Sequence, residues 1–173
     1  MKANKMREIE IEKVVLSMGA VGDELEKAAK LLKVIAGREP IKTKSKKRIP
    51  DFGIRLGLEI GCKVTLRGEK AEEILKKLLA VIDNKLKAKQ INDEDFSFGI
   101  EEYIEIPGIE YQRDIGMKGL NVTVVFKRKG KRVEFKKIKR GKLPKRQRVT
   151  KQEIIEYLIK NFNATILEGG AKE

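Results

Sequence analysis

The segment IGCKVTLR, residues 60–67, decides the fold class because it has the clearest strand pattern in the chain. Apolar and polar residues alternate along it, which is typical of a strand with one buried face. The residues predicted to face the core are Ile60, Cys62, Val64 and Leu66. The opposite face carries Gly61, Lys63, Thr65 and Arg67. We therefore expect a polar, cationic surface on which the glycine lets a ligand approach closely.

Amphipathic helices are predicted before and after this strand in the sequence. The first covers residues 23–36, with Asp23 as its capping residue. A second is predicted at about residues 69–89, from an apolar stripe with helical spacing. A third, at about residues 151–162, opens with the capping-box pattern of residues 150–153.

Further strands are predicted where apolar residues alternate, at 8–17, 96–106 and 120–126. Residues 41–57 and 112–119 are predicted to be loops, and the first of these is long enough to suggest a function. This order of elements predicts an α+β fold, a two-layer sandwich with a mostly antiparallel sheet.

The positive charge of the chain is concentrated in two segments. The 173 residues hold 40 Lys and Arg against 26 Asp and Glu, a net charge of +14. Residues 42–67, the first cationic segment, hold 8 bases and 2 acids. Residues 127–151, the second cationic segment, hold 14 bases and one acid, and weak alternation predicts a short strand or hairpin around Gly130. The rest of the chain holds 18 bases against 23 acids.

Such segregation favours a polyanion as partner, with nucleic acid ahead of an anionic membrane surface. Aromatic residues make up 5% of the chain, and few lie near the cationic segments. This scarcity argues against a stacking platform for single strands. It favours structured RNA that is recognised by shape and backbone.

The lack of histidine and the single cysteine exclude several kinds of site. A Ser-His-Asp or Cys-His catalytic centre, a zinc site of Cys and His ligands and an intramolecular disulfide cannot form. No apolar run is long enough to span a membrane, and no signal sequence is evident. We therefore expect a cytosolic protein with no metal, cofactor or membrane partner.

Three features could belong to an enzyme, and each has a simpler interpretation. The glycines spaced four apart between residues 53 and 61 follow no phosphate-loop motif. Acidic runs such as residues 93–95 are typical of solvated surface. Cys62 is predicted to be a buried, inert thiol. No catalytic activity is expected.

Residues 61–68, GCKVTLRG, together with the preceding residues 37–57, closely resemble the family of large-subunit ribosomal protein number five. The segments EKVVLSMG (12–19) and 96–124 match the family pattern in the same order, so the resemblance covers about residues 8–126. The basic extension and the helix RVTKQEIIEYL resemble the archaeal form of the family. The resemblance implies an antiparallel sheet with helices packed on one side, and no catalysis.

The resemblance also implies which residues contact RNA. The positions that match the family's 5S rRNA contacts are Lys13, Ser17, Arg38, Thr43, Lys63, Thr65 and Arg67. Ser17 stands where the family usually has Asn, and Arg38 where the bacterial form often has Gln. The loop expected to reach peptidyl-site tRNA carries Lys44, Lys46, Lys47, Arg48 and Arg55. In the basic extension, the residues expected to lie against rRNA are Lys127, Arg128, Lys131, Arg132, Lys139, Arg140 and Arg146.

The leading interpretation is a structural protein of the large ribosomal subunit that binds 5S rRNA in the central protuberance. Its further partners would be large-subunit rRNA, peptidyl-site tRNA and neighbouring ribosomal proteins, including one of the small subunit across the subunit bridge. Residues 1–126 would form the 5S rRNA-binding domain, with residues 127–173 as a basic extension and C-terminal helix packed on it. A generic structured-RNA binder or RNA chaperone that uses the same cations is the alternative.

Overall fold

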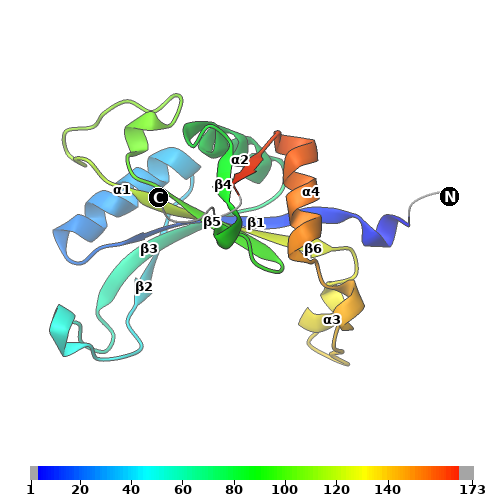
Figure 1. Cartoon of the computed structure of the whole chain (residues 1–173). Coiled ribbons are helices and arrows are strands. Elements are labelled where there is room, and N and C mark those ends of the chain that lie inside the picture. Colours follow the sequence, from blue (N-terminus) through cyan, green and yellow to red (C-terminus); the bar gives the residue numbers. More distant parts are fainter. Residues whose placement is uncertain (1–3, 168–173) are drawn as a thin grey trace. The chain divides into compact units, whose positions relative to one another are not determined.

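Five strands form one antiparallel sheet in the computed structural model, which describes residues 4–167 (Figure 1). They lie in the order β2-β3-β1-β6-β5. Their bounds are β1 (Ile9–Gly19), β2 (Ile41–Lys44), β3 (Glu59–Leu66), β5 (Asp95–Ile100) and β6 (Leu120–Arg128). Helices pack on one side of the sheet, so the predicted α+β sandwich is confirmed.

The longer helices are α1 (Asp23–Ala36), α2 (Glu69–Val81) and α4 (Lys151–Phe162). The shorter helix α3 spans Arg132–Phe135. A separate parallel pair of strands is formed by β4 (Lys85–Lys87) and β7 (Thr165–Leu167). Short 3₁₀ helices lie at Lys5–Arg7, Pro50–Phe52, Ala88–Gln90, Tyr103–Glu105 and Lys145–Gln147.

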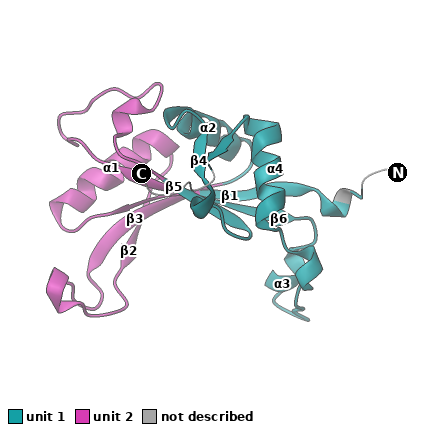
Figure 2. Cartoon of the chain, in the orientation of Figure 1, with its two compact units in different colours: residues 1–14, 67–98, 123–173 teal, residues 15–66, 99–122 magenta. Residues whose placement is uncertain are grey.

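By its internal contacts the chain divides into two compact units, which Figure 2 shows in different colours. Unit 1 comprises residues 1–14, 67–98 and 123–173, and unit 2 comprises residues 15–66 and 99–122. The strands β1, β5 and β6 contribute residues to both units.

In unit 2, α1 packs against β3. Leu25 and Leu32 on the helix are buried, as are Cys62 and Val64 on the strand. The predicted apolar faces of both elements are therefore confirmed.

The start of α1 differs from the prediction. Asp23 is the first helical residue, and Gly22 occupies the capping position without a side-chain hydrogen bond. Acidic residues fill the first turn instead, where they face the positive end of the helix dipole. Gly37 ends the helix in the left-handed conformation, at a φ of 62°.

A chain of aromatic contacts runs through unit 1. The Phe96 ring stacks with those of Phe98 and Phe126, at centroid distances of 6.0 and 5.8 Å. The Phe126 ring meets Tyr157 edge-on at 5.4 Å, and Tyr157 lies 6.3 Å from Phe162. These contacts join β5, β6 and α4, and pairs in such geometries contribute energy beyond simple burial.

The helix α2 ends at Val81 rather than near residue 89. Asp83 and Asn84 have φ values of 52° and 57°, a left-handed backbone that cannot continue an α-helix. Leu86, which the helical stripe included, is instead buried in β4. The helical spacing of apolar residues continues past the end of α2 because β4 also places one residue, Leu86, in the core.

Two of the predicted strands are wrong in part or entirely. Strand β5 ends at Ile100, and a 3₁₀ helix replaces the strand that was predicted to reach residue 106. Tyr103 in that helix is fully buried, and its hydroxyl oxygen accepts a hydrogen bond from the Gln112 N–H at 3.0 Å. The strand or hairpin predicted around Gly130 is replaced by the helix α3. The predicted loop at 112–119 is confirmed.

Within residues 4–167, no helix is both long and apolar enough to cross a membrane. No group of three or more Cys, Asp or Glu side chains in the same residues is arranged to hold a metal ion.

Candidate nucleic-acid interface

The strands β2 and β3 pair antiparallel, and one face of the pair is polar and cationic. Thr43 on β2 lies directly opposite Gly61 on β3, and Gly61 is two residues before Lys63. Alternate residues share a strand face, so Thr43 and Lys63 project from the same side. Lys63 is exposed, Thr65 is half-buried, and Arg67 is exposed just after the strand. The cationic strand face predicted from alternation is therefore confirmed.

Gly61 is buried, and the prediction that it leaves room for a ligand is wrong. A Cβ atom on this residue would lie 2.9 Å from the Met18 carbonyl oxygen and 3.1 Å from Thr43 Oγ1. The space beside Gly61 is thus filled by the backbone of β1 and by the threonine side chain. The glycine lets neighbouring strands approach closely, and it leaves room for the Thr43 hydroxyl on the polar face.

The loop predicted from residue 41 begins only at Ser45, because residues 41–44 form β2. Ser45 is buried at the base of this loop and closes it with several hydrogen bonds. Its N–H donates to the Leu58 carbonyl at 2.8 Å, and its carbonyl accepts from the Gly57 N–H at 3.0 Å. Its hydroxyl donates to the Lys47 carbonyl at 2.6 Å.

The tip of the 45–57 loop is also ordered by its own backbone. Ile49 and Ile54 exchange two hydrogen bonds of 2.9 and 3.0 Å around the 3₁₀ helix at Pro50–Phe52. Phe52 and Leu56 are 77% and 72% exposed. The predicted loop cations are all exposed: Lys44, Lys46, Lys47, Arg48 and Arg55.

The other predicted 5S rRNA contacts lie on separate elements. Lys13 and Ser17 are half-buried in β1, and Arg38 is exposed after α1. Ser17 lines an open hollow of about 520 Å³ in unit 2, together with Gly19, Gly99 and other residues. Thr43, Lys63 and Thr65 come together on one strand pair, whereas Lys13 and Arg67 belong to unit 1.

Cys62, the one thiol in the chain, is 2% exposed on the core side of β3. Burial raises the pKa of this thiol, although the charge of Lys118 acts in the opposite direction. The side chain is therefore a protonated apolar group and no nucleophile, as predicted.

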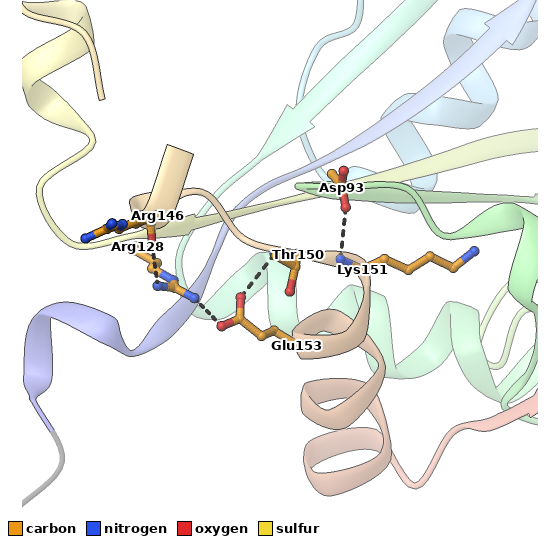
Figure 3. Close-up of polar contacts among 6 residues, drawn as sticks. All are labelled: Asp93, Arg128, Arg146, Thr150, Lys151 and Glu153. Carbon is orange, nitrogen blue, oxygen red and sulfur yellow. Dashed lines mark hydrogen bonds and ion pairs between the residues drawn. The ribbon is translucent and has the colours of Figure 1, made fainter. Parts of the chain in front are cut away.

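Arg128, at the end of β6, has a side chain that is only 8% exposed. Its guanidinium donates to a carboxylate oxygen of Glu153, and its Nη1 donates to the Arg146 carbonyl at 3.5 Å (Figure 3). Its Nε has no hydrogen-bond partner among the described residues. Arg128 thus ties β6 to the first turn of α4, and burial removes it from the surface on which the resemblance had placed it.

Thr150 and Glu153 form the predicted capping box of α4. The Thr150 N–H donates to Glu153 at 3.0 Å, and the Lys151 N–H donates to Asp93 Oδ1 at 3.1 Å (Figure 3). Burial raises the pKa of the Glu153 carboxyl, but the hydrogen bonds from Thr150 and Arg128 outweigh burial and hold the pKa below its ordinary value. One carboxylate therefore caps the helix and neutralises Arg128.

Lys129 and Lys131, which follow β6, form ion pairs with carboxylates in β1 and just before it. Lys129 Nζ lies 3.3 Å from an oxygen of Glu8 and of Glu10, and Lys131 Nζ lies 3.3 Å from Glu12. Hydrogen bonds and charge from Glu10 and Glu8 raise the pKa of Lys129. The sequence reasoning missed these partners, although their strict i, i+2 spacing places three glutamates on one strand face.

Glu94, just before β5, holds two cations of the same segment. Its carboxylate oxygens lie 3.5 Å from Lys131 Nζ and 3.8 Å from Arg148 Nε. The Glu94 carbonyl accepts a hydrogen bond from the Phe126 N–H at 2.8 Å, which fixes its backbone in unit 1. The second cationic segment is therefore anchored by acidic residues near both of its ends.

The exposed charge of the second cationic segment lies between these anchors. Within residues 4–167, the exposed cations from 132 to 146 form no ion pair. They are Arg132, Lys136, Lys137, Lys139, Arg140, Lys142, Lys145 and Arg146. Of the predicted rRNA contacts outside this group, Lys127 is half-buried, whereas Arg128 and Lys131 are held in ion pairs.

Two family models match the chain. The model for the C-terminus of the ribosomal protein L5 family matches residues 59–157, and the model described as ribosomal protein L5 matches residues 4–55. Together they include the β2–β3 pair and the whole of the second cationic segment.

Several archaeal proteins named large ribosomal subunit protein uL5 are similar over most of the chain. The protein from Nanoarchaeum equitans is 48% identical over 165 residues, which cover 94% of this chain and 98% of the relative. The protein from Methanosphaera stadtmanae is 45% identical over 152 residues, 87% of this chain and 90% of the relative. The protein from Sulfurisphaera tokodaii is 44% identical over 170 residues, 96% of each chain.

These matches settle the family and, with it, the general class of protein. The family consists of structural proteins of the large ribosomal subunit, a cytoplasmic ribonucleoprotein particle, and its members are not enzymes. The resemblance stated from the motifs is thereby confirmed, including its archaeal character. The chain belongs to the ribosomal protein L5 family.

Proposed function

We propose that the protein binds 5S rRNA in the central protuberance of the large subunit, mainly through the face of β2 and β3. The observation that carries this proposal is the Thr43 hydroxyl, which lies against Gly61 on the face that also bears the exposed Lys63. Alternate residues recur about every 7 Å along a strand, which suits a run of backbone phosphates. The hydroxyl and the cations of this face can then contact successive phosphates and 2′-hydroxyls.

The remaining proposed rRNA contacts lie on other elements. Lys13, Ser17, Arg38 and Arg67 are accessible at least in part, and we assign them to 5S rRNA. The exposed cations between residues 132 and 146 are assigned to large-subunit rRNA. Arg128 is assigned the role of holding the second cationic segment in place, since its own charge is neutralised by Glu153. In this scheme residues 1–126 bind 5S rRNA, and residues 127–173 extend the bound surface.

We further propose that the 45–57 loop contacts peptidyl-site tRNA. Ser45 fixes the base of the loop, and its tip presents exposed cations beside the exposed Phe52 ring. A preorganised loop loses less conformational freedom on binding than a flexible one. Neighbouring ribosomal proteins, including one of the small subunit across the subunit bridge, complete the proposed set of partners.

The test compares two double variants of equal charge change in binding to 5S rRNA. Lys63→Ala with Arg67→Ala removes cations from the proposed face, while Lys76→Ala with Lys77→Ala removes exposed cations of α2 that lie outside it. We expect the first variant to lose about 10- to 100-fold in affinity, with a salt slope lower by about 1.5. The control variant should bind as the wild type does.

The same measurement separates this function from a generic structured-RNA binder. Competition with tRNA and with an unrelated hairpin, at increasing salt, gives the preference for 5S rRNA. Equal affinity for all three RNAs, with little loss on Thr43→Val, would assign the chain to the generic class. A large fall in melting temperature for the Lys63 and Arg67 variant would show that these side chains support the fold instead.

A further inference from the structure

The exposed part of the second cationic segment, residues 132–146, folds back on itself and is called the basic lobe below. The Gly141 N–H donates to the Val133 carbonyl at 3.2 Å. A Cβ atom on Gly141 would lie 2.9 Å from Val133 Cγ1, so the two arms of this turn pack tightly. Lys139 has a φ of 53°, a left-handed conformation that reverses the chain. The lobe is therefore a defined turn between its two anchors.

Two large apolar side chains point outward from the basic lobe. Phe135 is 66% exposed and Ile138 is 78% exposed. By contrast, Phe96, Phe98 and Phe126 are buried in unit 1. Exposed apolar groups rimmed by charge are a mark of an interaction site.

The surroundings of Phe135 define what could bind there. The ring lines a hollow of about 400 Å³ together with Glu134, Arg140, Gly141 and Lys142. This volume falls within the range of small-ligand pockets. Glu134 is the one acid in the second cationic segment, and it is half-buried. An aromatic face beside two exposed cations matches a nucleotide, because the ring can stack on a base while the cations reach its phosphates.

We propose that the basic lobe binds one unpaired nucleotide of the RNA, with the base stacked on Phe135 and the flanking phosphates contacted by Arg140 and Lys142. The inference rests on the proposed RNA-binding function and adds a different mode of recognition. The strands β2 and β3 carry no aromatic residue, so their face can recognise backbone and shape alone. The excess of exposed cations over carboxylates on the lobe favours RNA over an apolar protein segment.

The test uses two RNA hairpins that are identical except for one bulged 2-aminopurine nucleotide. Phe135→Leu keeps an apolar side chain but removes the ring, Phe135→Tyr keeps the ring, and Tyr111→Leu removes another exposed ring outside the lobe. Phe135→Leu should lose about tenfold in affinity for the bulged hairpin and less than about twofold for the paired hairpin. Wild type, Phe135→Tyr and Tyr111→Leu should quench the 2-aminopurine fluorescence, whereas Phe135→Leu should not.

An equal loss on both hairpins, or quenching that persists in Phe135→Leu, would overturn the proposal. Circular dichroism of each variant checks the fold, which we expect to be unchanged because the replaced ring is exposed.

Binding of the wild type to 5S rRNA is measured alongside. If it binds 5S rRNA without a preference for the bulged hairpin, the stacking site alone fails, and if it does not bind 5S rRNA, the proposed function fails. An acidic amphipathic peptide whose binding depends on Phe135, while the bulge has no effect, would replace RNA by a protein partner.

Discussion

The two cationic segments differ in how their charge is used. In the first, residues 42–67, one ion pair is found among the described residues, between Lys42 and Glu59 at 3.3 Å. Its other cations lie on an exposed strand face or a loop. In the second, residues 127–151, four cations are engaged by acidic residues of the same unit: Arg128, Lys129, Lys131 and Arg148.

Charge counted in a sequence is therefore not the same as the charge available to a partner. The second segment has the larger excess, 14 bases against one acid, yet part of it neutralises carboxylates of unit 1. The structure separates anchoring cations near the ends of that segment from exposed cations in its middle. The first segment needs few such anchors because backbone pairing between β2 and β3 already fixes it.

The largest expected effect comes from removing an anchor of the second segment. Glu153→Ala leaves the Arg128 guanidinium buried without its carboxylate and removes the capping box of α4. We expect a loss of about 2–3 kcal/mol in unfolding free energy, which allows for the partial exposure of Glu153. Urea unfolding followed by circular dichroism measures this loss.

Glu156→Ala, an exposed change on the same helix, should cost less than about 0.5 kcal/mol. If Glu153→Ala and Glu156→Ala were equally stable, Glu153 would not act as an anchor.

A somewhat smaller effect is expected from Gly61→Ala, which tests whether backbone packing supports the first segment. The new methyl group would meet the Met18 carbonyl oxygen, which cannot move without shifting β1. We expect a loss of about 1–3 kcal/mol and weaker binding of 5S rRNA, because Thr43 would be displaced. Gly99→Ala is the matched control, since its Cβ would meet only Asn121 Oδ1 at 3.5 Å. Unchanged thermal unfolding of Gly61→Ala would mean that the strands adjust freely.

Two double variants compare anchoring with exposed cations within the second segment. Lys129→Ala with Lys131→Ala should lower the unfolding free energy, because both lysines pair with carboxylates, and leave the salt dependence of RNA binding nearly unchanged. Lys139→Ala with Arg140→Ala should leave stability unchanged and lower the salt slope by about 1.5. Filter binding at several salt concentrations, paired with thermal melts, gives both quantities. If the two double variants had similar salt slopes, the division of this segment into anchoring cations and RNA-binding cations would be wrong.

The smallest expected effect is a pH dependence of the Glu153 anchor. Its folded pKa lies below the ordinary value of 4.5, so the unfolded state takes up a proton first as the pH falls. The stabilisation is therefore complete above about pH 4.5 and is lost as the pH falls through the folded pKa. Urea unfolding of wild type and Glu153→Gln between about pH 7 and pH 3 should show their stabilities converging in this window. A constant difference at all pH values would show that Glu153 acts by its hydrogen bonds alone.

Elements with a strong local pattern could be predicted from the sequence. The alternation in residues 60–67 predicted β3 and its cationic face, and the capping-box residues predicted the start of α4. The pairing of β4 with β7 could not be predicted, because each strand has three residues and the partners are far apart in the chain. The end of α2 was missed for a related reason, since Leu86 fits the helical period but serves a strand.

The candidate site was predictable in its exposed part and not in its buried part. Exposed cations such as Lys63 and Arg48 follow from strand alternation and loop composition. The burial of Arg128 depends on Glu153, which lies 25 residues further along the chain, and no local rule links them. The sequence alone also argued against aromatic stacking, whereas the fold leaves the Phe135 ring exposed among the cations of the basic lobe.

The division into two units has a consequence for the nascent chain. All residues of unit 2 have been made once residue 122 is added, whereas unit 1 requires residues 123–167 and the pairing of β7 with β4. The residues of unit 2 are therefore available for folding before those of unit 1 are complete. Arg128 is made 25 residues before Glu153. In that interval Lys129 and Lys131 already have their carboxylate partners, whereas Arg128 still lacks its own, so an anion that bound Arg128 first would compete with formation of the Glu153 anchor.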